Sequence, residues 1–164
     1  HVIERVTELA RWSTRKQEHR ALGLAAHRSF LTYVAVVLSV VRDPAGTIRV
    51  DEAWIVADAG TIVNRERVEA QLEGAIIFGM SIGLYGAITM KGGATEQANF
   101  HDHRLVRIAE APRAIHVEIV PSSAPPGGVG EPGVPPVAPA LANAVFALTG
   151  ERVRELPILR HFRR

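Results

Sequence analysis

The sequence predicts an α+β fold in which a mixed sheet with a β-hairpin packs against about three helices. Three segments carry the continuous or alternating β-branched residues typical of strands, at 33–41, 48–56 and 114–120. Three others have the apolar spacing of helices, at 2–18, from Asn64 into the run 74–90, and at 136–150. Because strands and helices do not alternate strictly, α+β is favoured over a parallel α/β sheet.

The total of 164 residues is enough for one domain with a buried core. We therefore expect a single domain over 1–164, with a peripheral helix in 1–20 and the core in 21–164. The chain begins with His1, and its opening pattern is charged and helical, unlike a signal peptide. We expect the natural start to lie upstream.

The strand pattern predicts a hairpin made of 33–41 and 48–56, joined by a turn that contains Asp43, Pro44 and Gly46. In the second strand, alternation places four apolar residues on one side. They are Ile48, Val50, Trp54 and Val56. In the strand at 114–120, alternation likewise makes Ile115, Val117 and Ile119 face one way.

The middle helix is expected to begin at Asn64, a favourable N-cap, with Val63 and Val68 forming a hydrophobic staple around it. It runs into the uncharged segment 74–90, which glycines interrupt and which is slightly short for a membrane span. We expect a buried helix with no membrane span. Gly79 and Gly83 have the spacing of a close helix-packing motif.

The last helix carries its prolines in the first turn and ends at Gly150. Its expected buried stripe consists of Leu141, Ala144, Val145 and Leu148. The segment 156–158 is expected to form a short final strand.

Composition excludes several classes of function. The net charge is only +2, and the excess arginines lie near the two ends without interleaved aromatic residues, so a nucleic-acid partner is not expected. The chain has no cysteine, which excludes disulfides, iron–sulfur ligation within this chain and thiolate zinc sites. Because a chain without cysteine suits a reducing or an oxidising compartment, composition does not identify the compartment of this protein.

One acidic residue, Glu131, lies in a loop rich in proline and glycine, "PPGGVGEPGVPPVAP" at 125–139. The glycines, Gly128 and Gly130 among them, allow the backbone to approach a ligand closely, and the prolines stiffen the loop. Two interpretations follow. Glu131 is either a carboxylate that complements the N-terminus of the following helix or a general base on a rigid support.

Several segments together resemble the C-terminal part of the molybdopterin-binding large subunit of the xanthine dehydrogenase/aldehyde oxidase family. They are "GLAAHRSFLTYVAVV", "DAGTIVNRERVEAQLEGAIIFGMS", "NFHDHRLVRIAEAPRAIHVEIVPS" and "GGVGEPGVPPVAPALANAVFALTGERVRELPI". The group that they resemble most is the isoquinoline 1-oxidoreductase β-subunit. In order and spacing, the resemblance spans almost the whole chain after the first helix.

The resemblance implies a molybdenum hydroxylase, which oxidises an aldehyde or an N-heterocycle with oxygen taken from water. Its GxGE glutamate, here Glu131, acts as the general base. Its Q-x-E-G glutamine, here Gln71, hydrogen-bonds near the cofactor, and we expect the backbone at Gly128 and Gly130 to contact it too. The implied cofactor is molybdopterin cytosine dinucleotide with molybdenum. The [2Fe–2S] clusters would lie on a partner subunit.

Other polar motifs are expected to be structural. Asp58 and Asn64 fit a turn and a helix cap, although Arg65 stands where the family usually has proline. Glu73 and Gly74 are expected to be structural, Gly74 by permitting close packing. His101, Asp102 and His103 invite a zinc hypothesis, but a third ligand such as His116 or His27 would have to come from afar, so no metal site is expected there.

Because the family's large subunit is several times longer, this chain would hold the base without the whole site and would be inactive alone. Its expected partners are the remainder of the large subunit, an iron–sulfur small subunit and a small aldehyde or N-heterocyclic substrate. The alternative is a non-catalytic remnant that acts as a structural or subunit-interaction module. The sequence decides neither the substrate nor whether the protein is cytoplasmic or periplasmic.

Overall fold

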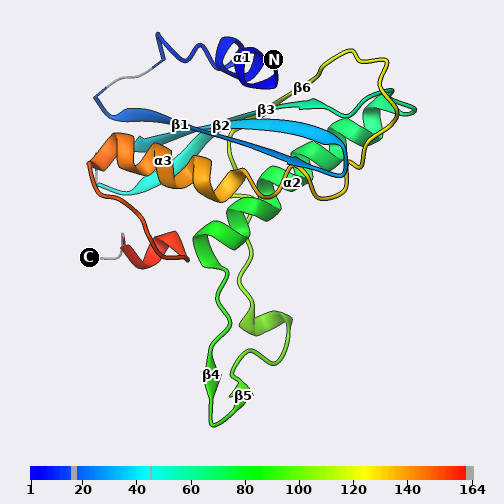
Figure 1. The fold of residues 1–164 in the computed structure, drawn as a ribbon. Helices are drawn as coiled ribbons and strands as arrows, with labels where there is room; N and C mark the ends of the chain where they lie inside the picture. The colour runs from blue at the N-terminus through cyan, green and yellow to red at the C-terminus, as the bar shows by residue number, and fades with distance from the viewer. Residues whose placement is uncertain (16–17, 45, 162–164) are drawn as a thin grey trace.

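The fold is α+β, as the sequence predicts, and consists of a mixed sheet with helices on both faces (Figure 1). The computed structural model describes residues 1–15, 18–44 and 46–161. The main sheet has the strand order β1-β2-β3-β6. Its strands are β1 (Arg20–Ser29), β2 (Thr32–Arg42), β3 (Ile48–Asp58) and β6 (Ala114–Ile119).

The first three strands form antiparallel hairpins, and β6 then pairs with β3 in parallel. The expected hairpin of β2 and β3 is confirmed. The sequence pattern did not indicate β1, because its Ala- and Gly-rich segment has low β-propensity. Residues 156–158 form no strand, since the chain bends there and enters the 3-10 helix η2 (Ile158–His161).

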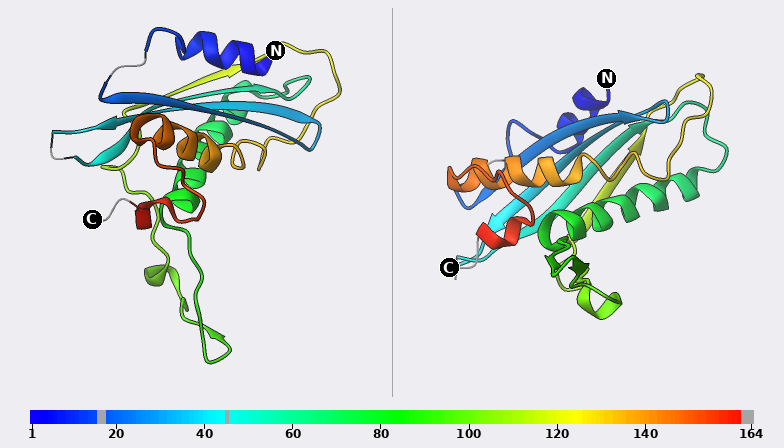
Figure 2. Two further views of the ribbon diagram at one scale, coloured as in Figure 1. Left: turned by 60° about the vertical axis from the view of Figure 1, so that its left-hand side comes forward. Right: turned by 60° about the horizontal axis from the view of Figure 1, so that its bottom comes forward.

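Two helices cover one face of the sheet, and a short helix covers the other (Figure 2). Helices α2 (Arg65–Tyr85) and α3 (Val137–Thr149) pack on the larger core. Helix α1 (Val2–Leu9) places Val6 against Trp54 and its neighbours on the opposite face. Helix α1 is shorter than the expected 2–18 because Ala10 caps it and Arg11 turns into the left-handed region, φ 52°. Residues 16 and 17 of that range lie outside the described residues.

A β-bulge in β3 changes which side chains face each core. In the pairing with β2, Ser39 lies opposite Glu52 and Val40 opposite Val50, so Asp51 is an extra residue. Val50 therefore faces α2 and α3, whereas Trp54 and Val56 face α1. The expectation that Ile48, Val50, Trp54 and Val56 share one side was wrong for this reason. In β6, Ile115, Val117 and Ile119 do face one core.

Helix α2 begins as expected, with the Asn64 side chain accepting a hydrogen bond from the Arg67 amide at 3.0 Å. The expected staple is absent, because Val63 is 92% exposed. Gly79 and Gly83 lie against α3, where Cβ atoms added to them would approach Val137 and Ala138. The opposite face of α2, which includes Gln71, Gly74 and Phe78, is exposed, so the helix is not fully buried. No helix among the described residues is long and apolar enough to cross a membrane.

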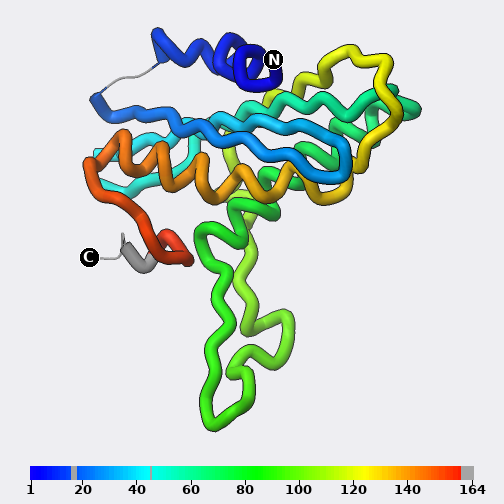
Figure 3. The backbone as a smooth tube through the Cα atoms, in the orientation of Figure 1, coloured from blue at the N-terminus to red at the C-terminus, as the bar shows by residue number. Residues whose placement is uncertain are grey.

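Between α2 and β6 the chain forms an arm, defined here as residues 86–113, that projects from the body (Figure 3). It contains the hairpin of β4 (Met90–Lys91) and β5 (Ala94–Thr95) and the 3-10 helix η1 (Phe100–Asp102). The motif His101–Asp102–His103 lies on this arm. No group of three potential metal-binding side chains occurs among the described residues.

Candidate functional site

The loop that carries Glu131 joins β6 to α3 and lies on α2. The Glu131 carbonyl accepts a hydrogen bond from the Val134 amide at 2.9 Å, which closes a β-turn containing Pro132 and Gly133. A Cβ atom on Gly133 would lie 2.7 Å from the Ala75 Cβ, so the turn rests directly on the helix. Only glycine allows this approach.

Gln71 lies one helical turn from this contact. A Cβ on Gly133 would also come within 3.5 Å of the Leu72 side chain, the neighbour of Gln71. The loop with Glu131 and the segment of α2 with Gln71 are therefore packed together, although their residues are 60 positions apart in the sequence. Both side chains are exposed. Within the described part of the chain, neither forms a hydrogen bond or an ion pair.

Glu131 does not cap the helix. The N-cap of α3 is Pro136, five positions later, and it provides no side-chain hydrogen bond. One of the two interpretations of Glu131, a carboxylate complementing the helix end, thus loses its geometric basis, since helix-end effects fall off within the first turn.

The two candidate glycines have different surroundings. At Gly128, an added Cβ would lie 2.8 Å from the Phe30 Cβ, so packing inside the chain accounts for this glycine. At Gly130, an added Cβ would meet no heavy atom within 4 Å. Gly74 is similarly open, so the expectation that it permits close packing was wrong within this chain.

The chemistry of these groups allows hydrogen bonds to a polar cofactor. The Gln71 amide can both donate and accept hydrogen bonds without adding charge, and the exposed backbone at Gly128 and Gly130 leaves room for close approach. Asp58 and Asn64 do not belong to this set. Asp58 accepts a hydrogen bond from the Gly60 amide at 3.2 Å, so it shapes a turn as expected, and Asn64 caps α2.

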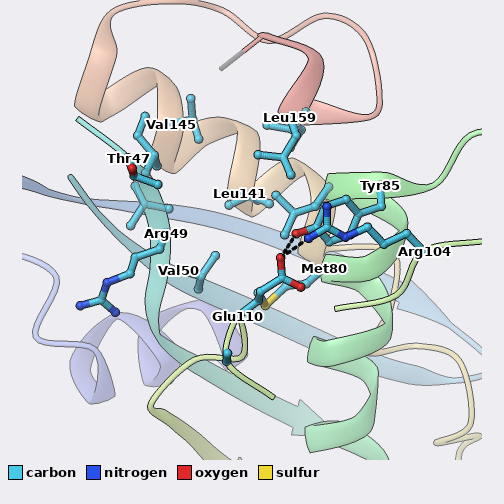
Figure 4. Close-up of a pocket in the computed structure, with 15 residues that line it drawn as sticks. Thr47, Arg49, Val50, Met80, Tyr85, Arg104, Glu110, Leu141, Val145 and Leu159 are labelled. Carbon is cyan, nitrogen blue, oxygen red and sulfur yellow. Dashed lines mark hydrogen bonds and ion pairs between the residues drawn. The ribbon is translucent and has the colours of Figure 1, made fainter. Parts of the chain in front are cut away.

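A separate pocket of about 290 Å³ lies at the other end of α2 and α3 (Figure 4). Apolar side chains such as Met80 and Leu141 line it, and a polar group of Tyr85, Arg104 and Glu110 lies at its side. The Glu110 carboxylate accepts hydrogen bonds from the Tyr85 hydroxyl and from Arg104 at 2.6 Å. Although burial raises the pKa of Glu110, the hydrogen bonds from Tyr85 and the Arg107 amide and the charge of Arg104 outweigh it, and the pKa is lowered.

A family model described as a molybdopterin cofactor-binding domain matches residues 5–112. The isoquinoline 1-oxidoreductase subunit beta of Brevundimonas diminuta is 33% identical over 161 residues, which cover 96% of this chain and 20% of that protein. A membrane-bound aldehyde dehydrogenase [pyrroloquinoline-quinone] of Gluconacetobacter polyoxogenes is 33% identical over 163 residues, covering 96% of this chain and 21% of that protein. Among solved structures, quinoline 2-oxidoreductase from Pseudomonas putida 86 matches with a TM-score of 0.71 and 22% identity, covering 80% of this chain and 18% of that one.

The chain therefore belongs to the molybdopterin cofactor-binding domain family. The resemblance to the C-terminal part of a molybdopterin-binding large subunit is confirmed. It spans about a fifth of the length of these relatives. The match to the family model includes Gln71 and ends before the loop that carries Glu131.

Proposed function

We propose that this chain carries the general base, Glu131, of a molybdenum hydroxylase that oxidises an aldehyde or an N-heterocycle with oxygen from water. The observation that carries the proposal is an exposed carboxylate, without a partner among the described residues, on a turn packed against the helix of Gln71. A base must be free to accept a proton and must extend from a fixed position, because small displacements of a reacting group are costly.

Gln71, Gly128 and Gly130 would hold the cofactor, molybdopterin cytosine dinucleotide with molybdenum. When bound, it supplies the redox chemistry. The amide of Gln71 would orient the cofactor through hydrogen bonds, and the glycine backbone would permit close contact. Glu131 would take the proton from the water-derived oxygen, a role that contributes about 10²–10⁴ in rate.

The proposed enzyme needs partners. The remainder of the large subunit would complete the substrate pocket, and a small subunit with [2Fe–2S] clusters would remove electrons. This chain alone is expected to be inactive, since its relatives are about five times longer. The alternative is a structural or subunit-interaction module without catalysis. Such a module would bind the same partner subunits, but it would need no chemical role for Glu131.

The test is Glu131→Gln in the chain co-expressed with the upstream part of its subunit and the small subunit. We expect turnover of an aldehyde or N-heterocycle, measured as the reduction of a dye, to fall by at least about 10²-fold. The molybdenum content should be unchanged. Glu151→Gln is the matched control, because it is the same change at an exposed glutamate beyond the other end of α3.

Two results would contradict the proposal. Loss of molybdenum in Glu131→Gln would give that residue a structural role. A complex that assembles but holds no molybdenum, both with the unchanged chain and with Glu131→Gln, would favour the non-catalytic module.

A further inference from the structure

The two-residue turn between β1 and β2 combines backbone strain with exposed apolar side chains. Phe30 and Leu31 have φ values of 50° and 67°, a region in which bulky residues are uncommon and for which Asn-Gly is the usual choice in such hairpins. The two residues are 63% and 66% exposed. The hairpin by itself would form better with another sequence. Such outliers persist when the surrounding structure holds them, and they cluster at functional sites.

This turn contacts the loop that leads to Glu131. The Gly128 amide donates to the Phe30 carbonyl at 2.8 Å, and the Thr32 hydroxyl donates to the Gly128 carbonyl at 2.7 Å. Both polar groups of the Gly128 backbone are thus bonded to the turn. The neighbouring Gly127 amide donates to the Ala59 carbonyl at 2.8 Å, so the end of β3 holds the same stretch.

The contact leaves no room for side chains at positions 127 and 128 of the loop. An added Cβ on Gly128 would lie 2.8 Å from the Phe30 Cβ, and one on Gly127 would overlap the Thr32 hydroxyl. Thr32 is completely buried, so its hydroxyl has a fixed position. The loop backbone therefore rests on the turn over two consecutive residues.

We propose that the Phe30–Leu31 turn and Thr32 are positioning residues, which fix the backbone at 127–128 and thereby the point from which Glu131 extends. The need for such a support follows from the surroundings of Glu131. No described residue holds its side chain, so its position depends on its backbone. We call the contact of this turn and Thr32 with residues 127–128 the clamp. The role given to Glu131 rests on the proposed function, whereas the clamp is a property of this chain.

The clamp is tested by amide hydrogen exchange in the 164-residue chain, with NMR as the readout. Gly128→Ala should separate the loop from the turn and speed exchange at the amides of 127 and 128 by about tenfold or more, as local opening becomes easier. The double variant Phe30→Gly with Gly128→Ala removes the opposing Cβ and should restore slow exchange. Exchange in β2 and β3 should remain slow in every variant, which shows that the fold is intact.

Thr32 provides an independent pair of variants. Thr32→Val removes the hydroxyl and keeps the shape, so we expect faster exchange at Gly127 and Gly128. Thr32→Ser keeps the hydroxyl and should exchange as the unchanged chain does. In the assembled enzyme, Thr32→Val should lower kcat and leave KM and molybdenum content unchanged, and Thr32→Ser should recover kcat.

Two outcomes would overturn the clamp as a positioning device. One is unaltered exchange at 127–128 in both Gly128→Ala and Thr32→Val. The other is an unaltered kcat in Thr32→Val when Glu131→Gln inactivates the same enzyme. If Glu131→Gln itself retains full turnover, the proposed function fails, and the exchange measurements still decide whether the clamp exists.

Discussion

Asp51 is a buried carboxylate that three arginines surround. Only 3% of its side chain is exposed, and Arg20 contacts it at 2.7 Å, with Arg49 and Arg113 at 3.2 Å. Burial raises its pKa, but the hydrogen bond and charge of Arg20, followed by those of Arg113, outweigh this effect, so the pKa of Asp51 is lowered. The carboxylate thus stabilises the folded chain in its ionised form.

We expect Asp51→Asn to lower the free energy of unfolding by about 1–3 kcal/mol at neutral pH, because hydrogen bonds to a charged group are lost. The folded-state pKa is depressed, so this stabilisation is present above the unfolded pKa of about 3.9 and is lost as pH falls through the folded value. Urea unfolding at neutral pH and near pH 3 measures both effects. Equal losses at the two pH values would contradict this account.

The β-bulge explains why the sequence pattern does not predict the cluster of Asp51, Glu52 and their arginines. In a regular strand, Asp51 and Glu52 would face opposite sides, and neither would signal an ionic centre. The extra residue places both among arginines from distant segments, with Arg113 contacting both carboxylates. In contrast, Glu131 is a candidate because a loop rich in proline and glycine surrounds it, and Gln71 is a candidate through the resemblance of its Q-x-E-G motif. Their common location depends on how Gly133 packs on α2 and could not be derived from spacing alone.

At the scale of elements, α2 carries glycines of two kinds. Gly79 lies against α3, where an added Cβ would be 2.5 Å from the Val137 Cβ, whereas Gly74 on the exposed face has open space. The spacing of Gly79 and Gly83 indicated close packing, and the structure identifies α3 as the partner. The open space at Gly74 could not be predicted, because sequence alone does not say which face of a glycine-rich helix is covered.

These two glycines give a matched pair of substitutions. Gly79→Ala should destabilise the chain by about 1–3 kcal/mol, because overpacking pushes α2 away from α3. Gly74→Ala should stabilise it by about 0.5–1 kcal/mol, because alanine is the better helix former and nothing opposes its methyl group. Thermal unfolding of both variants measures the difference. A stable Gly79→Ala chain would mean that the helices have room to separate.

Element boundaries followed local chemistry where that chemistry was distinctive. Asn64 and Gly150 mark helix ends in the sequence and in the structure, with Gly150 at φ 77°. Helix α1 was expected to be longer because charged, amphipathic sequence continues beyond Leu9. No local signal marks the left-handed turn at Arg11.

At the scale of the whole molecule, polar side chains attach the arm to the end of α2. Glu110 near the end of the arm accepts a hydrogen bond from Tyr85 at the end of α2, and Arg104 lies over the Tyr85 ring, with its guanidinium 4.0 Å from the ring centre. Two apolar residues of the arm, Phe100 in η1 and Ile108 close to Glu110, are more than 90% exposed. The arm is thus attached to α2 by this polar group and by the hydrogen bond from the Val106 amide to the buried Ser81 hydroxyl at 3.0 Å.

We expect Glu110→Gln to loosen the arm without unfolding the body, because a neutral amide forms weaker hydrogen bonds with Arg104 and Tyr85 than a carboxylate does. Hydrogen exchange should accelerate in 86–113 and stay slow in β2 and β3. Lys91→Gln is the control, because Lys91 is exposed on the same arm and its side chain forms no hydrogen bond or ion pair among the described residues. Equal exchange in both variants would show that other contacts hold the arm, such as the hydrogen bond from the Val106 amide to the Ser81 hydroxyl.

The parallel pairing of β6 with β3 also has a consequence for the order in which the molecule acquires its shape. Strands β1, β2 and β3 meet through short connections, whereas β6 reaches β3 only after residues 59–113 have been arranged. Distant pairings close large loops and are slow. During refolding, the meander of 20–58 should therefore gain its hydrogen bonds first, and the segment with Glu131 should be among the last to reach its native place.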